Sequence, residues 1–397
     1  MVSKRVEEIC PSLTLEITAK AKKMKAEGIS VIGFGAGEPD FNTPDYINDA
    51  AKKAIDIGFT KYTPASGTVE LKKAVCDKFL KDNNLVYKPE QIVISSGAKS
   101  SIYHALAALV NEGDQVILPT PYWLTYPELI KLCGGEVVYI HAGEESGYKI
   151  TAQQLDNAIN DKTKCLILNT PNNPTGAVYS EEEIREIAKV CEKHGIYVLS
   201  DEIYEKLVYA GEKHFSIASC SDYMKEHTVI VNGMSKTYAM TGWRIGYIAA
   251  PTDIAKAVSS MQSHTTSNAC SIAQYASTEA LTSPEGDKFI GEMQQIFDQR
   301  RKFMVDYLKD IKGIVCVEPK GAFYVFVNVS SYYGKSYDGK VINGSLSFAE
   351  NALKLGVAVI PGIAFGDDDC IRLSYAISMD DIKEGLERLD KFITSLK

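Results

Sequence analysis

Apolar and polar positions along the first three quarters of the chain predict strands and helices in turn. Short runs rich in β-branched residues are typical of buried strands, and each run ends where polar or turn-forming residues begin. The strands predicted in this way are residues 91–95, 115–118, 164–168, 196–200 and 228–231. Because helix-type segments separate them, the pattern favours an α/β fold with a mostly parallel sheet covered by helices.

Two helix starts in this region carry capping signals. The segment Thr-Pro-Asp at 43–45 predicts a threonine cap with proline at the first helical position, and Gly58 is placed to end that helix. Ser180 and Glu183 have the spacing of a capping box. The helix that they open should bury its apolar positions three and four residues apart, which are Ile184, Ile187, Ala188 and Cys191.

The pattern changes beyond about residue 285. A long charged helix at 288–310 is followed by strands at 315–329 and 371–375, and then by an amphipathic helix from Asp380. This order predicts a second, smaller α+β domain. With no repeat or Pro/Ser-rich linker, the boundary should run through the long helix.

The length of 397 residues favours two to three domains. We predict a large domain at 45–287 and a small domain built from 1–44 together with 288–397. This division would place the alternating strands and helices in the large domain.

Charge and cysteine usage narrow the classes of function. A net charge of −8 without a long basic run disfavours binding to nucleic acid or to an anionic membrane. Nine scattered cysteines without a C-x-x-C pair are typical of reduced thiols, which predicts a cytoplasmic protein. The first residues lack the apolar core of a signal peptide, and no window is apolar enough to cross a bilayer. The six histidines lack the spacing of a zinc site, so we expect no metal.

Lys236 is the most informative candidate. It follows the predicted strand 228–231, and the carboxyl ends of parallel strands are where open α/β sheets hold ligands. Ser235 beside it and Arg244 eight residues on suit an amine nucleophile next to a phosphate clamp. For a lysine in isolation, the alternative is a solvated surface residue.

Two further clusters end neighbouring strands. Asp201 follows 196–200, where a carboxylate is costly unless it meets a cation. It could keep a pyridine nitrogen protonated, or it could simply cap a helix. The turn-rich segment 169–176 follows another strand, and Asn173 and Tyr204 could both donate to a phenolate oxygen of an aromatic cofactor.

Anion-binding features complete the set. Residues 95–100 follow a strand and open an apolar helix, so their free amides and the helix dipole make an anion site. Arg372 lies in a short apolar strand, where it would grip a carboxylate or else form an internal salt bridge or lie on an edge strand. The glycines at 33–37 do not complete a dinucleotide-binding motif, and S-x-x-K at 96–99 lacks the companion motifs of serine acyltransferases.

These motifs together resemble the class I aminotransferases of pyridoxal-phosphate fold type I, closest to the bacterial aspartate aminotransferase branch. They occur in family order and span nearly the whole chain. They are AGEPDF at 36–41, KYTPASG at 61–67, PYWLTYPE at 121–128, NTPNNPTG at 169–176, SDEIYE at 200–205, SKTYAMTGWRIGY at 235–247 and IRLSYA at 371–376.

The resemblance implies pyridoxal 5′-phosphate as cofactor, in the large domain, and a role for each site residue. Lys236 would bind the cofactor covalently and then carry a proton as general acid and base. The implied cofactor-binding residues are Gly97, Ala98, Lys99, Trp123, Asn173, Asp201, Tyr204, Ser235, Lys236 and Arg244, with Tyr62 reaching the phosphate of the other subunit in a homodimer. The implied substrate-binding residues are Gly37, Lys99, Trp123, Asn173 and Arg372.

Two departures bear on substrate choice. The best-known branch binds the distal carboxylate with an arginine after the lysine-bearing segment, but residues 263–267 contain none, and Lys99 fits the position that this branch uses instead. A lone lysine is less demanding than a bidentate arginine, so some tolerance for other substrates is expected. Cys10 stands where members that also use prephenate carry a basic residue, which lowers the prephenate expectation without removing it.

The resemblance therefore implies reversible amino transfer from L-aspartate to 2-oxoglutarate through pyridoxal and pyridoxamine forms of the cofactor. An aminotransferase of broader specificity, with prephenate, aromatic or alanine substrates, is the main alternative, and a lyase of the same fold is a further one. Aminotransferase-like transcription regulators carry an extra basic DNA-binding region, and only about 30 residues precede AGEPDF here.

Overall fold

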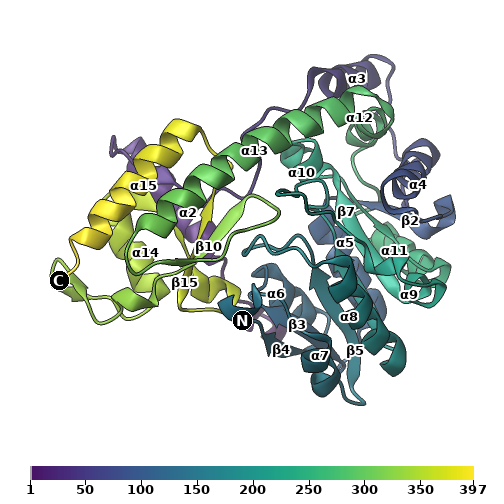
Figure 1. The fold of residues 1–397 in the computed structure, drawn as a ribbon. Helices are drawn as coiled ribbons and strands as arrows, with labels where there is room; N and C mark the ends of the chain where they lie inside the picture. Colours follow the sequence, from purple (N-terminus) through teal and green to yellow (C-terminus); the bar gives the residue numbers. More distant parts are fainter. Residues whose placement is uncertain (1) are drawn as a thin grey trace.

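The computed structural model describes residues 2–397, and its largest element is a seven-stranded sheet (Figure 1). Within that sheet six strands are parallel, and β8 runs against both of its neighbours, β2 and β7. In the order β2-β8-β7-β6-β5-β3-β4, the strands span Ile92–Ser95, Gly246–Ala249, Thr228–Gly233, Tyr197–Asp201, Thr163–Asn169, Gln115–Thr120 and Glu136–His141. The predicted α/β fold is confirmed, and each predicted strand begins within one residue of its observed start.

Helices cover both faces of this sheet. Alternate strand residues point to opposite faces, so Cys165 and Ile167 of β5 pack with α5, α6 and α11, whereas Leu166 and Leu168 pack with α7 and α8. Burial on both faces explains why these strands are almost continuously apolar. The helices are α5 (Ala98–Leu109), α6 (Thr125–Leu132), α7 (Ala152–Ala158), α8 (Glu181–His194), α9 (Asp222–Glu226) and α11 (Thr252–Thr265).

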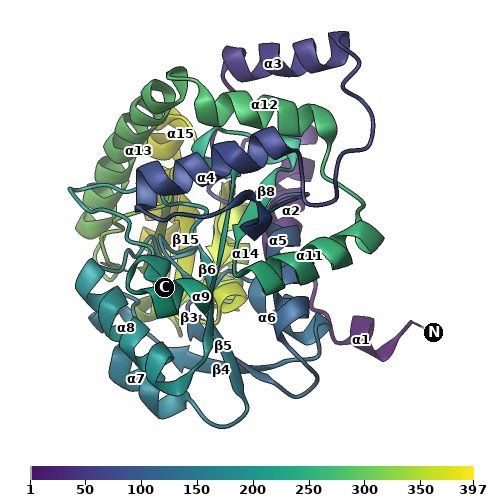
Figure 2. The ribbon, with the colours of Figure 1, turned by 90° about the vertical axis from the view of Figure 1, so that its right-hand side faces the viewer.

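A further layer lies beyond one end of the sheet. Helices α3, α4 and α12 pack together there, as the side view in Figure 2 shows. They span Asp45–Asp56, Val69–Asn83 and Ser271–Thr282. Ser180 and Glu183 form the predicted capping box of α8, and the four predicted apolar positions of that helix are buried.

The predicted threonine cap of α3 is wrong. The helix begins after Pro44, and Thr43 makes no capping hydrogen bond. Its hydroxyl is already used, because it donates to the Ala239 carbonyl (2.7 Å) and accepts from Trp243 Nε1 (3.0 Å). Gly58 follows the helix with a φ of 72°, as a helix-ending glycine should.

A second group of elements lies at the other end of the long helix α13 (Glu285–Asp310), on the left of Figure 1. Its sheet has the order β14-β15-β10-β9, and the strands span Ile360–Pro361, Cys370–Ser374, Tyr324–Asn328 and Val315–Cys316. The predicted strand at 315–329 is therefore two strands. The chain turns between them, where Ala322 has a φ of 57° that a continuous strand does not allow.

The N-terminal part of the chain packs on this second group. Helix α2 contacts β13 and β14, and β1 pairs in parallel with β13. The remaining elements are α1 (Lys4–Glu7), α2 (Leu13–Ala26), β1 (Ile32–Gly33), β11 (Ser336–Tyr337), β12 (Lys340–Val341), α14 (Ser345–Lys354), β13 (Val357–Ala358) and α15 (Met379–Thr394). The domain limits at 44/45 and 287/288 stay a prediction. Within residues 2–397, no helix combines the length and apolar character that crossing a bilayer requires.

Candidate active site

Three of the predicted site residues come from neighbouring strands of the large sheet. Asp201 is the last residue of β6, Asn173 lies in the loop after β5, and Lys236 lies in α10 (Met234–Thr237) directly after β7. These three strands are adjacent and parallel, so their carboxyl ends open at the same edge of the sheet. Such an edge is the usual ligand-binding position of an open α/β sheet.

Lys236 is held as a candidate nucleophile and base. Its Nζ donates to the Gly37 carbonyl at 2.5 Å and lies 5.9 Å from the ring of Tyr204 and 5.7 Å from that of Phe323. Burial lowers the pKa of the ammonium to about 8, while the negative charge of Glu38 acts in the opposite direction. About a tenth of the amine is therefore neutral at pH 7, far more than for an ordinary lysine, and the neutral form is the nucleophile.

Asp201 is a buried carboxylate, with 3% of its surface exposed. Its Oδ2 accepts a hydrogen bond from the Tyr126 hydroxyl at 2.7 Å, and its Oδ1 accepts from the Ile203 amide at 3.2 Å. Burial raises the pKa of the carboxyl to about 6, although these two hydrogen bonds lower it. The carboxylate is thus mostly ionised at pH 7 and can pair with a protonated ring nitrogen.

The start of α5 forms a cradle for an anion. Gly97 precedes the helix with a φ of 87° and gives no side-chain cap, so the first amides, beginning with Ala98, have no intrahelical partner. A Cβ on Gly97 would lie 2.3 Å from Nη2 of Arg244, and a Cβ on Gly246 would lie 2.2 Å from the Ala98 nitrogen. Both glycines are therefore needed for this close approach. Ser235 is 7% exposed, and its hydroxyl has no hydrogen-bond partner within residues 2–397.

Arg372 is buried without a counter-ion. Its Nη1 donates to Asn173 Oδ1 (2.8 Å), its Nη2 donates to the Gly35 carbonyl (3.4 Å), and its guanidinium lies over the rings of Tyr324 and Phe365. Its Nε has no partner, and no carboxylate among the described residues pairs with it. It lies on β15, an interior strand, so the salt-bridge and edge-strand alternatives are both wrong. A buried guanidinium of this kind suits a carboxylate ligand.

Lys99 is a second unpaired cation. It is the second residue of α5, and its Nζ lies 4.9 Å from the ring centroid of Trp123. Burial, with a smaller contribution from Arg244, lowers the pKa of its ammonium. No ion pair to Lys99 occurs within the part of the chain that the structure describes, which leaves it free for an anionic ligand.

Asn173 and Tyr204, the predicted donors to a ring oxygen, each contact a neighbouring polar side chain. Because Asn173 accepts from Arg372 through Oδ1, its Nδ2 amine group is left to donate. Tyr204 is buried, and its hydroxyl shares a hydrogen bond of 3.1 Å with that of Tyr324. The Asn173 amide donates to Asn169 Oδ1, which fixes this loop to the end of β5.

The loop at 35–40 connects this site to both groups of elements. Besides the carbonyl contacts of Gly35 and Gly37, Glu38 accepts a hydrogen bond from the Thr241 hydroxyl at 2.6 Å, next to the turn that carries Arg244. Asp40 forms a bidentate ion pair with Arg300 of α13 at 2.7 and 2.9 Å. One short loop therefore contacts the lysine, the arginine of β15 and the long helix.

Tyr62 is the predicted site residue that the structure does not bring to the others. It is 90% exposed and makes no hydrogen bond within the described residues. A cavity of about 640 Å³ opens beside the anion cradle, with Ser96 and Arg244 in its wall. The predicted reach of Tyr62 to the phosphate of a second subunit stays a prediction.

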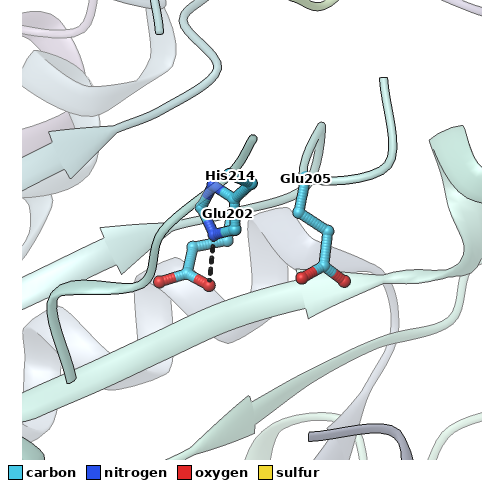
Figure 3. A group of neighbouring side chains, drawn as sticks. All are labelled: Glu202, Glu205 and His214. Atoms are coloured by element: carbon cyan, nitrogen blue, oxygen red, sulfur yellow. Dashed lines mark hydrogen bonds and ion pairs between the residues drawn. The ribbon is translucent and has the colours of Figure 1, made fainter. Parts of the chain in front are cut away.

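One group of side chains has the spacing of metal ligands, namely Glu202, Glu205 and His214 (Figure 3). Its acceptors are already used. Glu202 accepts from His214 Nε2 at 2.9 Å and from two serine hydroxyls, and Glu205 pairs with the Lys78 ammonium. The lysine takes the place that a cation would need, so we read the group as a buried charge network behind the site.

Sequence reasoning missed three residues that contact the site. Tyr126 and Asn169 lie within motifs that were singled out, PYWLTYPE and NTPNNPTG, so a signal for them was present. Tyr324 lies on β10, in an apolar run that carries no motif, and only the pairing of β10 with β15 brings it to Arg372.

Comparison with known proteins agrees with this geometry. A model of the family described as aminotransferase class I and II matches residues 29–389. The chain is 49% identical over 393 residues to an aspartate aminotransferase of Bacillus sp. (strain YM-2), with 99% of each chain covered. It is 45% identical to a probable aspartate/prephenate aminotransferase of Aquifex aeolicus, with 100% of this chain and 99% of the relative covered. The crystal structure of the aspartate aminotransferase from Rhizobium meliloti superposes with a TM-score of 0.96, at 41% identity and with 100% of both chains covered.

Proposed function

This chain belongs to the class I and II aminotransferases, and from that premise we propose that it transfers the amino group of L-aspartate to 2-oxoglutarate, reversibly, giving oxaloacetate and L-glutamate. The family uses pyridoxal phosphate, and we propose the same cofactor here. When bound, that cofactor supplies an aldehyde that takes up the amino group and a ring that accepts the electron pair released at the substrate Cα.

The residues of the site fit this cofactor. The free amides of α5, Ser235 and Arg244 would bind the phosphate, and Asp201 would hold the proton of the ring nitrogen. Trp123, Asn173 and Tyr204 would complete the contacts to the cofactor ring, since all three lie near the other basic and polar side chains of the site. Lys236 would accept the proton of the substrate Cα on Nζ and return it during the transfer.

The observation that best supports a dicarboxylic substrate is the number of basic side chains in the site that have no ion pair. Four basic side chains of the site form no ion pair within residues 2–397, namely Lys99, Lys236, Arg244 and Arg372. A cofactor phosphate would use Arg244, and the cofactor aldehyde would use Lys236. Arg372 and Lys99 then remain, one for the α-carboxylate and one for the distal carboxylate, as aspartate and glutamate require.

A donor panel tests this proposal. With 2-oxoglutarate as acceptor, kcat/KM should be higher for aspartate and glutamate than for alanine, phenylalanine or kynurenine. In Lys99→Ala the values for aspartate and glutamate should fall about 10- to 100-fold, because a hydrogen bond to a charged group is lost, whereas alanine should change by less than about twofold. Steady-state assays of each donor measure this.

Lys131→Ala is the matched control, since Lys131 is a lysine of the neighbouring helix α6 whose ammonium is already paired with Glu128 at 3.2 Å. Equal losses for all donors in Lys99→Ala would refute the role of Lys99, and no transamination of aspartate by the wild type would refute the proposed reaction. Prephenate is added as an acceptor, because several relatives are named for it, whereas Cys10 stands here in place of a basic residue. Product release without an acceptor would identify a lyase instead.

We further propose that the protein is a homodimer with shared active sites. Large side chains between residues 55 and 69 are exposed, although they are apolar or aromatic: Ile55, Ile57, Tyr62 and Val69. Covering this segment with a second copy would bury it and bring the partner's Tyr62 toward the cavity beside Arg244. Light scattering should give twice the mass of one chain, and a catalytically active monomer would contradict the shared site.

A further inference from the structure

Tyr126 donates the one side-chain hydrogen bond that the carboxylate of Asp201 receives within the described residues. Its hydroxyl donates to Oδ2 at 2.7 Å, and both residues are almost fully buried, with 1% and 3% of their surfaces exposed. Tyr126 lies on the first turn of α6, a different element from the strand that carries Asp201. The contact therefore joins a helix on one face of the sheet to the carboxyl end of β6.

The carboxylate needs such a donor. Burial disfavours the charged form of Asp201, and the charge of Glu202, next in sequence, acts in the same direction. The groups that act in the other direction are the Tyr126 hydroxyl, the Ile203 amide and the Lys236 ammonium. Of these, Tyr126 is a side chain whose only polar atom, the hydroxyl oxygen, donates its hydrogen bond to the carboxylate.

We propose that Tyr126 is a positioning residue that keeps Asp201 ionised and aimed at the cofactor's ring nitrogen. This inference rests on the proposed function. A phenylalanine at 126 would fill the same space but leave a buried carboxylate oxygen without a donor, which shifts the group toward its neutral form. A neutral carboxyl no longer attracts a protonated ring nitrogen. The affinity for the cofactor and the acid limb of the pH profile of kcat/KM should therefore both depend on the Tyr126 hydroxyl.

A role in packing alone is the competing explanation. The ring of Tyr126 packs against Trp123, edge to face, with centroids 5.3 Å apart, and it belongs to the apolar core between α5, α6 and the sheet. Phenylalanine preserves these ring contacts. Any effect that follows the hydroxyl therefore separates the two explanations.

The test compares Tyr126→Phe with Tyr179→Phe. Tyr179 is a matched control, because it is 4% exposed and its hydroxyl is also used in a buried hydrogen bond, which it accepts from the Ile150 amide at 2.9 Å and not from a group that contacts the Asp201 carboxylate. Equilibrium dialysis of pyridoxal phosphate against each apoprotein gives the dissociation constant. It should rise about tenfold in Tyr126→Phe and stay within about twofold in Tyr179→Phe. The acid limb of kcat/KM should move up by about one pH unit in Tyr126→Phe alone.

A double variant with Asp201→Ala makes the result decisive. If Tyr126 acts through the carboxylate, adding Tyr126→Phe to Asp201→Ala should change the dissociation constant by less than about twofold. A further tenfold loss in that background, or equal losses in the two tyrosine variants, would overturn the inference in favour of packing. A wild type that does not bind pyridoxal phosphate would refute the proposed function itself. A wild type that binds it and a Tyr126→Phe variant that binds it equally well would refute only the role of Tyr126.

Discussion

Replacing Lys236 by alanine should lower kcat for transamination by at least about 10⁴-fold, because the change removes the proton carrier together with the covalent attachment of the cofactor. The cofactor should still bind, since the cradle at Gly97, the guanidinium of Arg244 and the carboxylate of Asp201 remain. Reduction with borohydride should attach one cofactor permanently to each wild-type chain and none to the variant. Mass spectrometry of the treated proteins measures this.

Lys99→Ala serves as the control for this prediction, because it removes another basic side chain of the site without touching the proton carrier. It should retain covalent attachment and alanine turnover. A Lys236→Ala protein with more than about one hundredth of the wild-type kcat would show that the base lies elsewhere.

Replacing Arg372 by leucine should lower kcat/KM for aspartate and for 2-oxoglutarate between about 10²- and 10⁴-fold, which corresponds to about 3–5 kcal/mol for a buried charge pair with the substrate. Arg372→Lys should recover only part of this, because an ammonium does not reproduce the planar fork. The melting temperature should be unchanged or higher, since the guanidinium is buried in the free protein without a counter-ion. Steady-state kinetics and thermal unfolding measure the two effects.

Arg301 provides the contrast. It is also fully buried, but its guanidinium is paired with Asp298 at 2.8 Å and with Glu318 at 2.6 Å. Arg301→Leu should therefore lower the melting temperature, because it leaves carboxylates without their partner, while the folded fraction keeps its kcat/KM. If Arg372→Leu destabilised the protein as much and left kcat/KM unchanged, Arg372 would be a structural residue.

The sequence was sufficient for the parts of the molecule whose signals are local. Strand ends are marked by a change from apolar to turn-forming residues, which placed Lys236 and Asp201 at the correct edge of the sheet. The capping box at Ser180 was equally local. Contacts between distant elements were not foreseeable in this way. Thr43 was expected to cap a helix, but Ala239 and Trp243, about 200 residues away, take its hydroxyl.

The same distinction applies within the site. The residue type and position of Arg372 suggested a carboxylate, but its lack of a counter-ion became evident only from the interior position of β15 and the aromatic rings around it. Tyr126 lies within the motif PYWLTYPE, but the motif does not tell which of its residues contacts Asp201. Its importance comes from its distance to Asp201, which depends on how α6 packs on the sheet.

The loop at 35–40 imposes a constraint on anyone who would redesign this enzyme. At two of its positions the contacts are made by peptide carbonyls, from Gly35 to Arg372 and from Gly37 to Lys236. A Cβ on Gly37 would meet nothing closer than 3.8 Å, so changing the side chain there leaves the carbonyl where it is. Adding or deleting one residue would shift both carbonyls at once. The spacing of the loop, more than its composition, therefore sets where its two carbonyls meet Lys236 and Arg372.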